Sequence, residues 1–471
     1  MSDTVVTTTA GAVRGRSGSV ARVFLGIPYA AAPTGSARFA EPAPHTPWRG
    51  IRDATQPGPT APQARRGGFG NLDMSPYFGP GWVPGADYLT VSVWAPPAAR
   101  RRPVMVFVHG GGFVSGSTRA PLYDGTAFAR DGVVLVTVNY RLGVTGFLDL
   151  PGAPANRGLL DIVAALRWVR ENIEAFGGDP GNVTLFGQSA GATIVAGVLA
   201  TPEAAGLFHR AILQSGSGLG AFSPDQAAKV TQAAAAALGT EPTCACFAEV
   251  PDDELVDLVP KLTGLDLRSG TRFDPLVGLS PFSLVLETQP ADTVATGASA
   301  DVTLIIGTNT EEGNLYIAPE GKSARSSEAD LHHLAAQVSA DPAALIASYR
   351  ALRPSANGAE LRSAVLGDAL FGTGSRRLAE AHTRQGRGST YTYEFAWQST
   401  ASDGQLGAAH TVELPFVFDC LDLPALRGAR GLLGPAEPPT ALAVQMHRAW
   451  VDFAHTGDPG WRPSEMHYFA E

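Results

Sequence analysis

The sequence predicts an α/β protein in which helices flank a mostly parallel central sheet. Residues 104–108 and 133–138 form two short, largely apolar runs, which are typical of strands buried on both faces. Glycine-rich turns and segments with helical periodicity follow such runs along the chain. Strands that alternate with helices through short joints favour a parallel sheet covered on both sides.

The remaining elements of this sheet follow in order. Residues 156–176 carry apolar side chains at three- and four-residue spacings, which indicates an amphipathic helix that a Gly-Gly-Asp-Pro turn ends. We expect a second helix over residues 190–200 and further strands over residues 183–186, 211–213, 302–306 and 391–397.

The chain shows no internal repeat and no linker that divides it, so we expect a single domain over residues 1–471. Two alanine-rich helical stretches, at about 218–300 and 314–388, interrupt the alternation. We interpret them as insertions at one edge of the sheet. Such insertions form a lid or a pocket wall, or serve only as scaffolding.

Composition argues against several classes of partner. The chain has 35 Lys and Arg residues against 44 Asp and Glu, a net charge of −9, whereas nucleic-acid binding rests on clustered basic side chains. No apolar run approaches the roughly 20 residues of a membrane-spanning helix. We therefore expect neither a nucleic-acid nor a membrane partner, and the sequence gives no indication of oligomeric state.

The cysteines indicate a reducing compartment. Cys244, Cys246 and Cys420 supply neither a disulfide framework nor a four-ligand zinc site. The N-terminus lacks the basic segment and apolar stretch of a signal peptide. These features predict a cytoplasmic protein, and nothing in the sequence calls for a metal or a cofactor.

A serine motif points to the chemistry. Residues 187–191 read Gly-Gln-Ser-Ala-Gly and match G-x-S-x-G, between an expected strand and an expected helix. That strand–turn–helix context is the one a nucleophile elbow requires, so it predicts the α/β-hydrolase fold with Ser189 as the nucleophile. The alternative is a glycine-rich turn without chemistry.

A serine hydroxyl needs a base, and the chain order in this fold is serine, acid, histidine. His410 lies in an expected loop after the strand at 391–397, whereas most other histidines fall in expected helices. Glu311 and Glu312 follow the strand at 302–306, and spacing alone leaves both open as the acid. The acid would hold the imidazole in the correct tautomer and stabilise the imidazolium.

A glycine loop completes the pattern. Residues 109–113 read His-Gly-Gly-Gly-Phe directly after the strand at 104–108. In such loops backbone amides, with the amide that follows the nucleophile, bind the negative oxygen of an acyl-transfer intermediate. A phosphate-binding interpretation would require G-x-x-x-x-G-K-[ST], which the chain lacks.

Further motifs extend from about Gly11 to Trp461. They are Gly26-Ile27-Pro28-Tyr29-Ala30, Arg38-Phe39, Asn139-Tyr140-Arg141-Leu142-Gly143, Phe176-Gly177-Gly178-Asp179-Pro180, Gln214-Ser215-Gly216 and His410-x-x-Glu413-Leu414-Pro415-Phe416. With them, the chain resembles the type-B carboxylesterase family, which contains cholinesterases and bacterial para-nitrobenzyl esterases. The resemblance implies a serine esterase that hydrolyses a small-molecule carboxylic ester through an acyl-enzyme.

The resemblance also implies site residues. It implies Ser189 as nucleophile, His410 as base and Glu312, which precedes Gly313, as the acid. The implied oxyanion-hole amides are those of Gly111, Gly112 and Ala190. The implied supporting residue is Ser215, and Phe113, Phe416 and Phe418 are implied to line the acyl side of the pocket, unless they belong to the core.

The chain departs from the family at several places, including Ile162 for a usual glutamine and Gln188 for the glutamate of animal members, and two departures bear on the site. Ala86-Asp87-Tyr88-Leu89 replaces a Glu-Asp-Cys-Leu run, so a disulfide of secreted members cannot form and Arg38 needs another partner. The loop at about 57–86, which helps to shape the gorge, does not align with the family. The preferred substrate is therefore open.

Two other functions share these motifs. A biosynthetic acyltransferase, lactonase or cyclase would use the same triad while excluding water, and the sequence does not separate it from an esterase. A binding module would keep the fold without catalysis, as adhesion proteins of the family do. The intact serine, histidine and glycine loop argue against a binding module.

Overall fold

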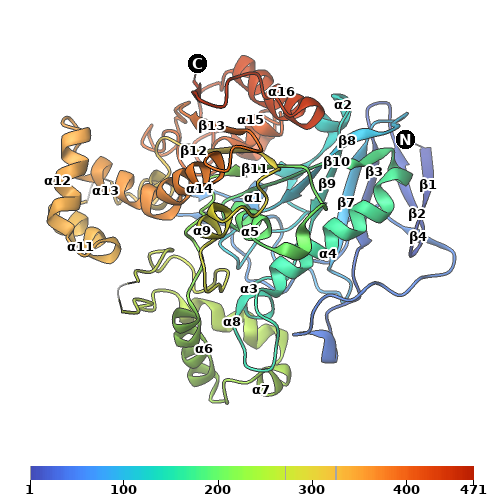
Figure 1. Ribbon diagram of the computed structural model, residues 1–471, viewed down its shortest axis with the longest axis horizontal. Helices are drawn as coiled ribbons and strands as arrows, with labels where there is room; N and C mark the ends of the chain where they lie inside the picture. Colours follow the sequence, from blue (N-terminus) through green and yellow to red (C-terminus); the bar gives the residue numbers. More distant parts are fainter. Residues whose placement is uncertain (1, 271, 324–325, 471) are drawn as a thin grey trace.

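One large sheet organises the chain in the computed structural model, which describes residues 2–270, 272–323 and 326–470 (Figure 1). Within these residues the strands lie in the order β1-β2-β3-β7-β9-β8-β10-β11-β12-β13-β14, with β4 beside β2. The strands are β1 (Ser2–Thr8), β2 (Gly11–Ser17), β3 (Arg22–Pro28), β4 (Ile51–Asp53), β7 (Thr90–Ala95), β8 (Arg102–Val108), β9 (Val134–Val138), β10 (Gly178–Gln188), β11 (Arg210–Gln214), β12 (Thr303–Asn309), β13 (Thr390–Phe395) and β14 (Met466–Phe469). A separate hairpin consists of β5 (Gly68–Phe69) and β6 (Leu72–Asp73).

The neighbouring strands β9, β8, β10, β11, β12, β13 and β14 pair in parallel in that order. This confirms the mostly parallel sheet predicted from the sequence. The pairs that join β1, β2, β3, β7 and β9 are antiparallel and were not predicted. In β2 buried and exposed positions alternate, so this strand has no continuous apolar run to mark it.

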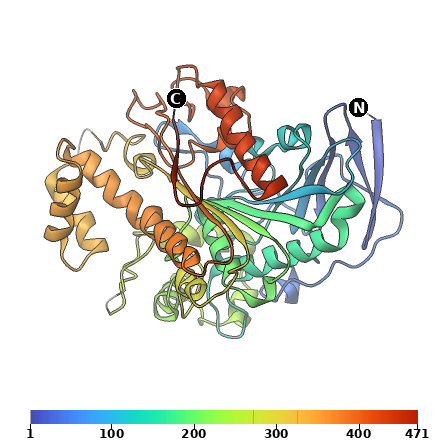
Figure 2. The same ribbon diagram turned by 45° about the horizontal axis from the view of Figure 1, so that its top comes forward.

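Both faces of the central strands are buried, because successive side chains point to opposite sides. Val104, Val106 and Val108 of β8 belong to one core cluster, and Met105 and Phe107 belong to the other. Figure 2 shows α16 on one side of the sheet and α4 on the other. The flanking helices are α4 (Arg157–Asn172), α5 (Ala190–Leu199) and α16 (Thr440–Thr456).

The two predicted insertions hold most of the remaining helices. Residues 218–300 contain α6 (Pro224–Leu238), α7 (Cys244–Ala248), α8 (Asp252–Leu262) and α9 (Pro290–Ala295). Residues 314–388 contain α10 (Asn314–Ile317), α11 (Glu328–Val338), α12 (Pro342–Leu352), α13 (Gly358–Gly367), a π-helical turn (Asp368–Gly372) and α14 (Thr373–Thr383). Short helices elsewhere are α1 (Ser75–Phe78), α2 (Thr126–Arg130), α3 (Gly143–Phe147) and α15 (Leu414–Val417).

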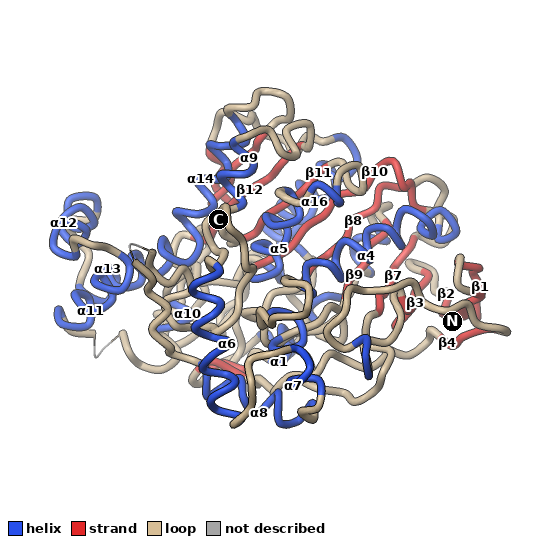
Figure 3. Tube along the Cα trace, turned by 60° about the horizontal axis from the view of Figure 1, so that its bottom comes forward, coloured by secondary structure: helices blue, strands red, loops and turns tan. Residues whose placement is uncertain are grey.

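Helices α11, α12 and α13 have a small core of their own. Leu331, Leu334, Ile346 and Leu361 are buried there in a cluster separate from the two that cover the sheet. Figures 1 and 3 both show these helices at the opposite end of the molecule from β1–β4. The same cluster includes Phe371 of the π-helical turn, which connects it to the site described below.

Arg38, which lacks its usual glutamate, is paired with the start of α8. Its Nη2 lies 2.5 Å from Oδ1 of Asp252, and its Nη1 donates to the carbonyl oxygen of Val250 at 2.6 Å. The first insertion is thereby tied to the N-terminal part of the chain. None of the helices in the described segments has the length and apolar character to cross a bilayer.

Candidate active site

A sharp turn between β10 and α5 places Ser189 at the carboxyl end of its strand. Ser189 has φ 59° and ψ −127°, a conformation that side-chain-bearing residues rarely adopt. A Cβ atom added to Gly191 would collide with the carbonyl oxygen of Val108, and one added to Gly187 would lie 2.7 Å from the backbone of Gly191. The flanking glycines therefore permit the tight turn that presents the serine.

Ser189, His410 and Glu312 come together from three distant segments of the chain. Nε2 of His410 lies 2.8 Å from Oγ of Ser189, and Nδ1 of His410 lies 2.6 Å from Oε2 of Glu312. All three side chains are buried. With a proton on Nδ1 donated to the carboxylate, Nε2 is free to accept the serine hydroxyl hydrogen.

The structure distinguishes the two adjacent glutamates. Glu312 faces His410, whereas Oε2 of Glu311 accepts a hydrogen bond of 2.8 Å from the amide of Ala408. Successive side chains leave the backbone in different directions, so only one of the two reaches the imidazole. Glu312 is therefore hydrogen-bonded to His410, and Glu311 takes no part in the row of hydrogen bonds that joins Glu312, His410 and Ser189.

Two donors fix the orientation of the Glu312 carboxylate. The hydroxyl of Ser215 donates to Oε1 at 2.5 Å, and the backbone amide of Asn309 donates to the same oxygen at 2.7 Å. The other oxygen, Oε2, is then left to the imidazole. Ser215 thus lies where the resemblance places a supporting residue.

Gly111, Gly112 and Ala190 line the same cavity as Ser189. None of their backbone amides donates to another group in the described part of the chain. Gly111 has φ 117°, and a Cβ atom there would collide with the carbonyl oxygen of Ser115. Ala190 begins α5, where the helix dipole adds positive potential. Backbone amides without an acceptor beside a serine hydroxyl are groups that can bind a negative oxygen.

His109, the first residue of the glycine loop, packs against Tyr140. Its ring stacks on Tyr140 with centroids 4.5 Å apart, and the Tyr140 hydroxyl donates to the His109 carbonyl oxygen at 2.7 Å. Burial lowers the pKa of His109 to about 4. The ring is therefore neutral near pH 7, and it adds no positive charge beside the amides.

A cavity of about 80 Å³ opens over Ser189 and His410. The loop at 57–86 contributes Arg66, Phe69, Met74, Tyr77 and Phe78 to its wall. The two insertions contribute Leu276, Leu279, Ser280, Leu315, Tyr316, Leu370 and Phe371. Within the described residues, no group of three or more His, Cys, Asp or Glu side chains is arranged to hold a metal ion.

The three phenylalanines proposed for the pocket have different positions. Phe113 lines the cavity, as expected. Phe416 and Phe418 do not line it and pack in the core instead, which is the alternative that their sequence left open. Phe416 lies 5.1 Å from Phe395 between ring centroids, and Phe418 lies 5.1 Å from Phe107.

Comparison with known proteins decides the family. A family model described as the carboxylesterase family matches residues 2–468. The chain belongs to the carboxylesterase family. It is 35% identical over 468 residues to the para-nitrobenzyl esterase of Bacillus subtilis (strain 168), covering 98% of this chain and 91% of that protein. It is also 35% identical over 462 residues to the phenmedipham hydrolase of Pseudarthrobacter oxydans, covering 96% and 90%.

Solved structures agree. A carboxylesterase of Geobacillus stearothermophilus superposes with a TM-score of 0.83 at 36% identity, covering 99% of this chain and 96% of that one. A PNB esterase superposes with a TM-score of 0.82 at 33% identity, covering 98% and 92%. The predicted α/β-hydrolase fold is therefore confirmed, and the protein is a carboxylic-ester hydrolase.

Sequence reasoning missed the aromatic ring that supports the histidine of this carboxylesterase. Phe371 stacks on His410 with ring centroids 4.1 Å apart and planes within 7° of parallel. It belongs to the π-helical turn after α13. Such turns recur at functional sites, but no repeating pattern of residue types marks them in a sequence.

Glu413, a residue of the family motif, is a second buried carboxyl group beside the site. Its Oε2 accepts from Nδ2 of Asn309 at 2.8 Å, and its Oε1 accepts from Nε2 of Gln214 at 3.3 Å. Burial, and secondarily the neighbouring Glu312 carboxylate, raise the pKa of Glu413 to about 7. The carboxylesterase therefore takes up a proton here near neutral pH.

This shift predicts a stability that depends on pH. The pKa of Glu413 is about 7 in the folded state against an ordinary value of 4.5, so between these values only the folded protein binds the proton. The free energy of unfolding should therefore fall as the pH rises, by about 2 kcal/mol between pH 5.5 and pH 8. The Glu413→Gln variant should lack this pH-dependent part of the free energy of unfolding. Denaturant unfolding of both proteins at about pH 5.5 and about pH 8 measures it, and an identical difference between them at both pH values would contradict the assignment.

Proposed function

We propose that this carboxylesterase hydrolyses small-molecule esters with Ser189 as nucleophile, His410 as general base and acid, and Glu312 as the orienting carboxylate. One observation carries the proposal: the row Glu312–His410–Ser189, joined at 2.6 Å and 2.8 Å, ends at the cavity. Such a row is the arrangement that activates a serine hydroxyl.

In the first half of the reaction, Oγ of Ser189 attacks the ester carbonyl carbon while its proton passes to Nε2 of His410. The carbonyl oxygen becomes negative and is bound by the amides of Gly111, Gly112 and Ala190. Each such donor stabilises the transition state by roughly 3 kcal/mol. His410 then donates its proton to the leaving alkoxide, the ester C–O bond breaks, and an acyl-serine remains.

In the second half, water takes the place of the alcohol. His410 removes a proton from the water as it attacks the acyl-serine carbonyl, and the same amides bind the oxygen again. Collapse of this intermediate releases the carboxylic acid and returns the proton to Oγ of Ser189. Glu312 stays ionised throughout and stabilises the imidazolium that forms twice per turnover.

The fold and the location in the cell belong to the same proposal. We propose that residues 1–471 form one α/β-hydrolase domain in which the insertions at 218–300 and 314–388 supply the cavity wall. We also propose a cytoplasmic location, which the free thiols of Cys244, Cys246 and Cys420 support, since disulfides are typical of oxidising compartments.

Hydrolysis of p-nitrophenyl butyrate tests the proposed reaction. We expect p-nitrophenolate and free butyrate to appear in equal amounts, because water resolves the acyl-enzyme. Absorbance follows the first product, and chromatography quantifies the second. Nitrophenolate without free acid, or with transfer of the butyryl group to an added alcohol in preference to water, would instead identify an acyltransferase.

A further inference from the structure

The cavity contains one cation that the proposed mechanism does not use. Among the described residues that line it, Arg66 is the only side chain with a permanent charge. Its guanidinium forms no hydrogen bond or ion pair with any residue in the described ranges. Arg66 lies in the loop at 57–86, the part of the chain that departs from the family.

Aromatic rings hold this guanidinium in place. Its Cζ lies 4.5 Å from the centroid of Phe69 and 5.0 Å from that of Phe78. Cation–π contacts of this kind stabilise a partly desolvated charge but occupy none of the five N–H donors of arginine. Burial lowers the pKa of Arg66 without a carboxylate to offset it. The hydrogen-bonding edge of the guanidinium is therefore available to a ligand.

The buried arginines elsewhere have their donors satisfied. Arg141 forms a buried ion pair of 2.7 Å with Asp161. Arg157 donates to the carbonyl oxygens of Thr145 at 2.7 Å and Leu148 at 2.7 Å. These contacts offset the cost of burying a charge, as is usual in proteins. Arg66 is partly buried and lacks such contacts, so its donors are left for a ligand.

Arg66 also lies beside the groups that receive the ester. A Cβ atom added to Gly112 would lie 3.8 Å from Nη1 of Arg66. The guanidinium is thus close to Gly112, one of the residues whose amides are assigned to the carbonyl oxygen. A group bound to it would be only a few bonds from the carbonyl carbon that Ser189 attacks.

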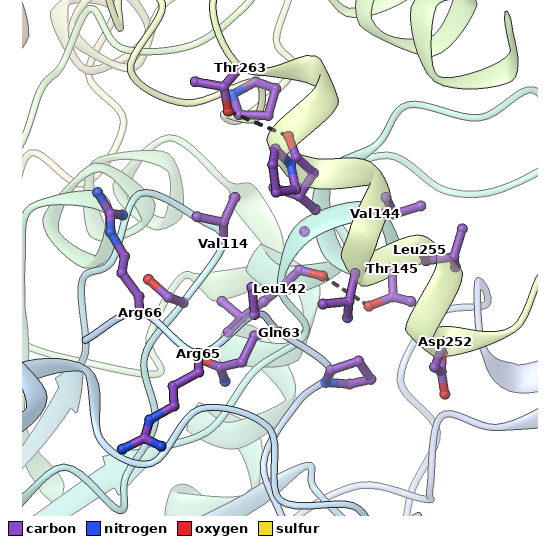
Figure 4. A pocket seen from close by; sticks show the side chains of 18 of the residues that line it. Gln63, Arg65, Arg66, Val114, Leu142, Val144, Thr145, Asp252, Leu255 and Thr263 are labelled. Carbon is purple, nitrogen blue, oxygen red and sulfur yellow. Dashed lines mark hydrogen bonds between the residues drawn. The ribbon is translucent and has the colours of Figure 1, made fainter. Parts of the chain in front are cut away.

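A second pocket adjoins this position. It has a volume of about 270 Å³ and shares Arg66 and Leu279 with the catalytic cavity. Figure 4 shows Arg65 and Arg66 on the side opposite Asp252. Because Asp252 is already paired with Arg38, it does not neutralise these arginines.

We propose that Arg66 binds a carboxylate on the substrate, so that the preferred substrates are half-esters of short dicarboxylic acids. This inference rests on the proposed function, because it assigns a substrate class to the same site. The guanidinium fork matches the two oxygens of a carboxylate, and the unpaired charge favours an anion. The net charge of −9 repels anions in general, so a preference for them requires a local cation such as Arg66.

The test compares monoethyl succinate, glutarate and adipate with the ethyl ester of the corresponding monoamide, near pH 8. Each pair differs only in its carboxylate or carboxamide end, and ethanol release gives kcat/KM. We expect wild-type protein to favour the acid over the amide by about tenfold or more for at least one length. Arg66→Gln should remove most of this preference, Arg66→Lys should retain part of it, and added salt should weaken it.

Arg65→Gln is the matched control, because it removes the same charge from the adjacent residue, which does not line the catalytic cavity. It should leave the acid-to-amide ratio unchanged. A wild-type ratio at or below one for all three lengths, or an unchanged ratio in Arg66→Gln, would overturn the inference. Hydrolysis of the amide esters in that case would leave the proposed esterase function standing, whereas hydrolysis of neither series would overturn both.

Discussion

Ser189→Ala should lower kcat by about 10⁴- to 10⁶-fold while leaving the fold intact. The row of hydrogen bonds ends at Oγ of Ser189, so this change removes the atom that attacks the ester. The amides of Gly111 and Gly112 would still bind the carbonyl oxygen, which leaves a small residual rate. Steady-state hydrolysis of p-nitrophenyl butyrate measures kcat, and thermal unfolding reports on the fold.

Ser217→Ala is the control for this experiment. It removes the same atom from another buried serine, whose Oγ accepts a hydrogen bond of 3.2 Å from the amide of Leu219 and does not line the cavity. We expect this variant to keep most of the activity. Turnover by Ser189→Ala close to the wild-type rate would exclude Ser189 as the nucleophile.

Glu312→Gln should lower kcat by about 10⁴-fold with little change in stability. Ser215 and the amide of Asn309 both donate to Oε1, so the glutamine carbonyl will occupy that position. The glutamine NH₂ group then faces Nδ1 of His410, 2.6 Å away in the wild type, and donates to it. The proton of a neutral imidazole moves to Nε2, which can no longer accept the proton of Ser189.

Glu311→Gln provides a closely matched control. The two glutamates are adjacent and the change in charge is the same, but Glu311 contacts the amide of Ala408 rather than His410. Its kcat should remain near the wild-type value, measured with the same ester. Equal losses in the two variants would indicate that general charge near the site, rather than the tautomer of His410, determines the rate.

The sequence predicts the parts of the site that have local patterns. The runs at 104–108 and 133–138, which correspond to β8 and β9, are largely apolar because both faces of the sheet are covered. The elbow glycines are recognisable because a Cβ atom at Gly187 or Gly191 would collide with neighbouring backbone. The choice of Glu312 over Glu311 could not be made from a local pattern. Spacing left both open, and the family resemblance selected the residue that the structure brings to His410.

The features that escaped prediction depend on contacts between distant segments. Phe416 and Phe418 lie close to His410 in sequence, yet both are buried in the core cluster that contains Phe107 and Phe395 and do not line the cavity. Phe371 lies at the site because it belongs to a π-helical turn, and Arg66 lies there because it belongs to a glycine-rich loop. No periodicity in the sequence predicts the course of the backbone in such a turn or loop, since packing against other segments determines it.

The separate core of α11–α13 has a consequence for how this enzyme can diversify. The reactive serine is held by the sheet, whereas part of the wall that substrates meet is carried by a helical unit with its own apolar interior. Substitutions in the parts of that unit that do not contact Glu312 or His410 can therefore change the cavity wall while leaving the row from Glu312 to Ser189 in place. Two contacts limit this independence: the Phe371 ring stacks on His410, and a Cβ atom added to Gly367 of α13 would lie 3.0 Å from Cβ of Glu312.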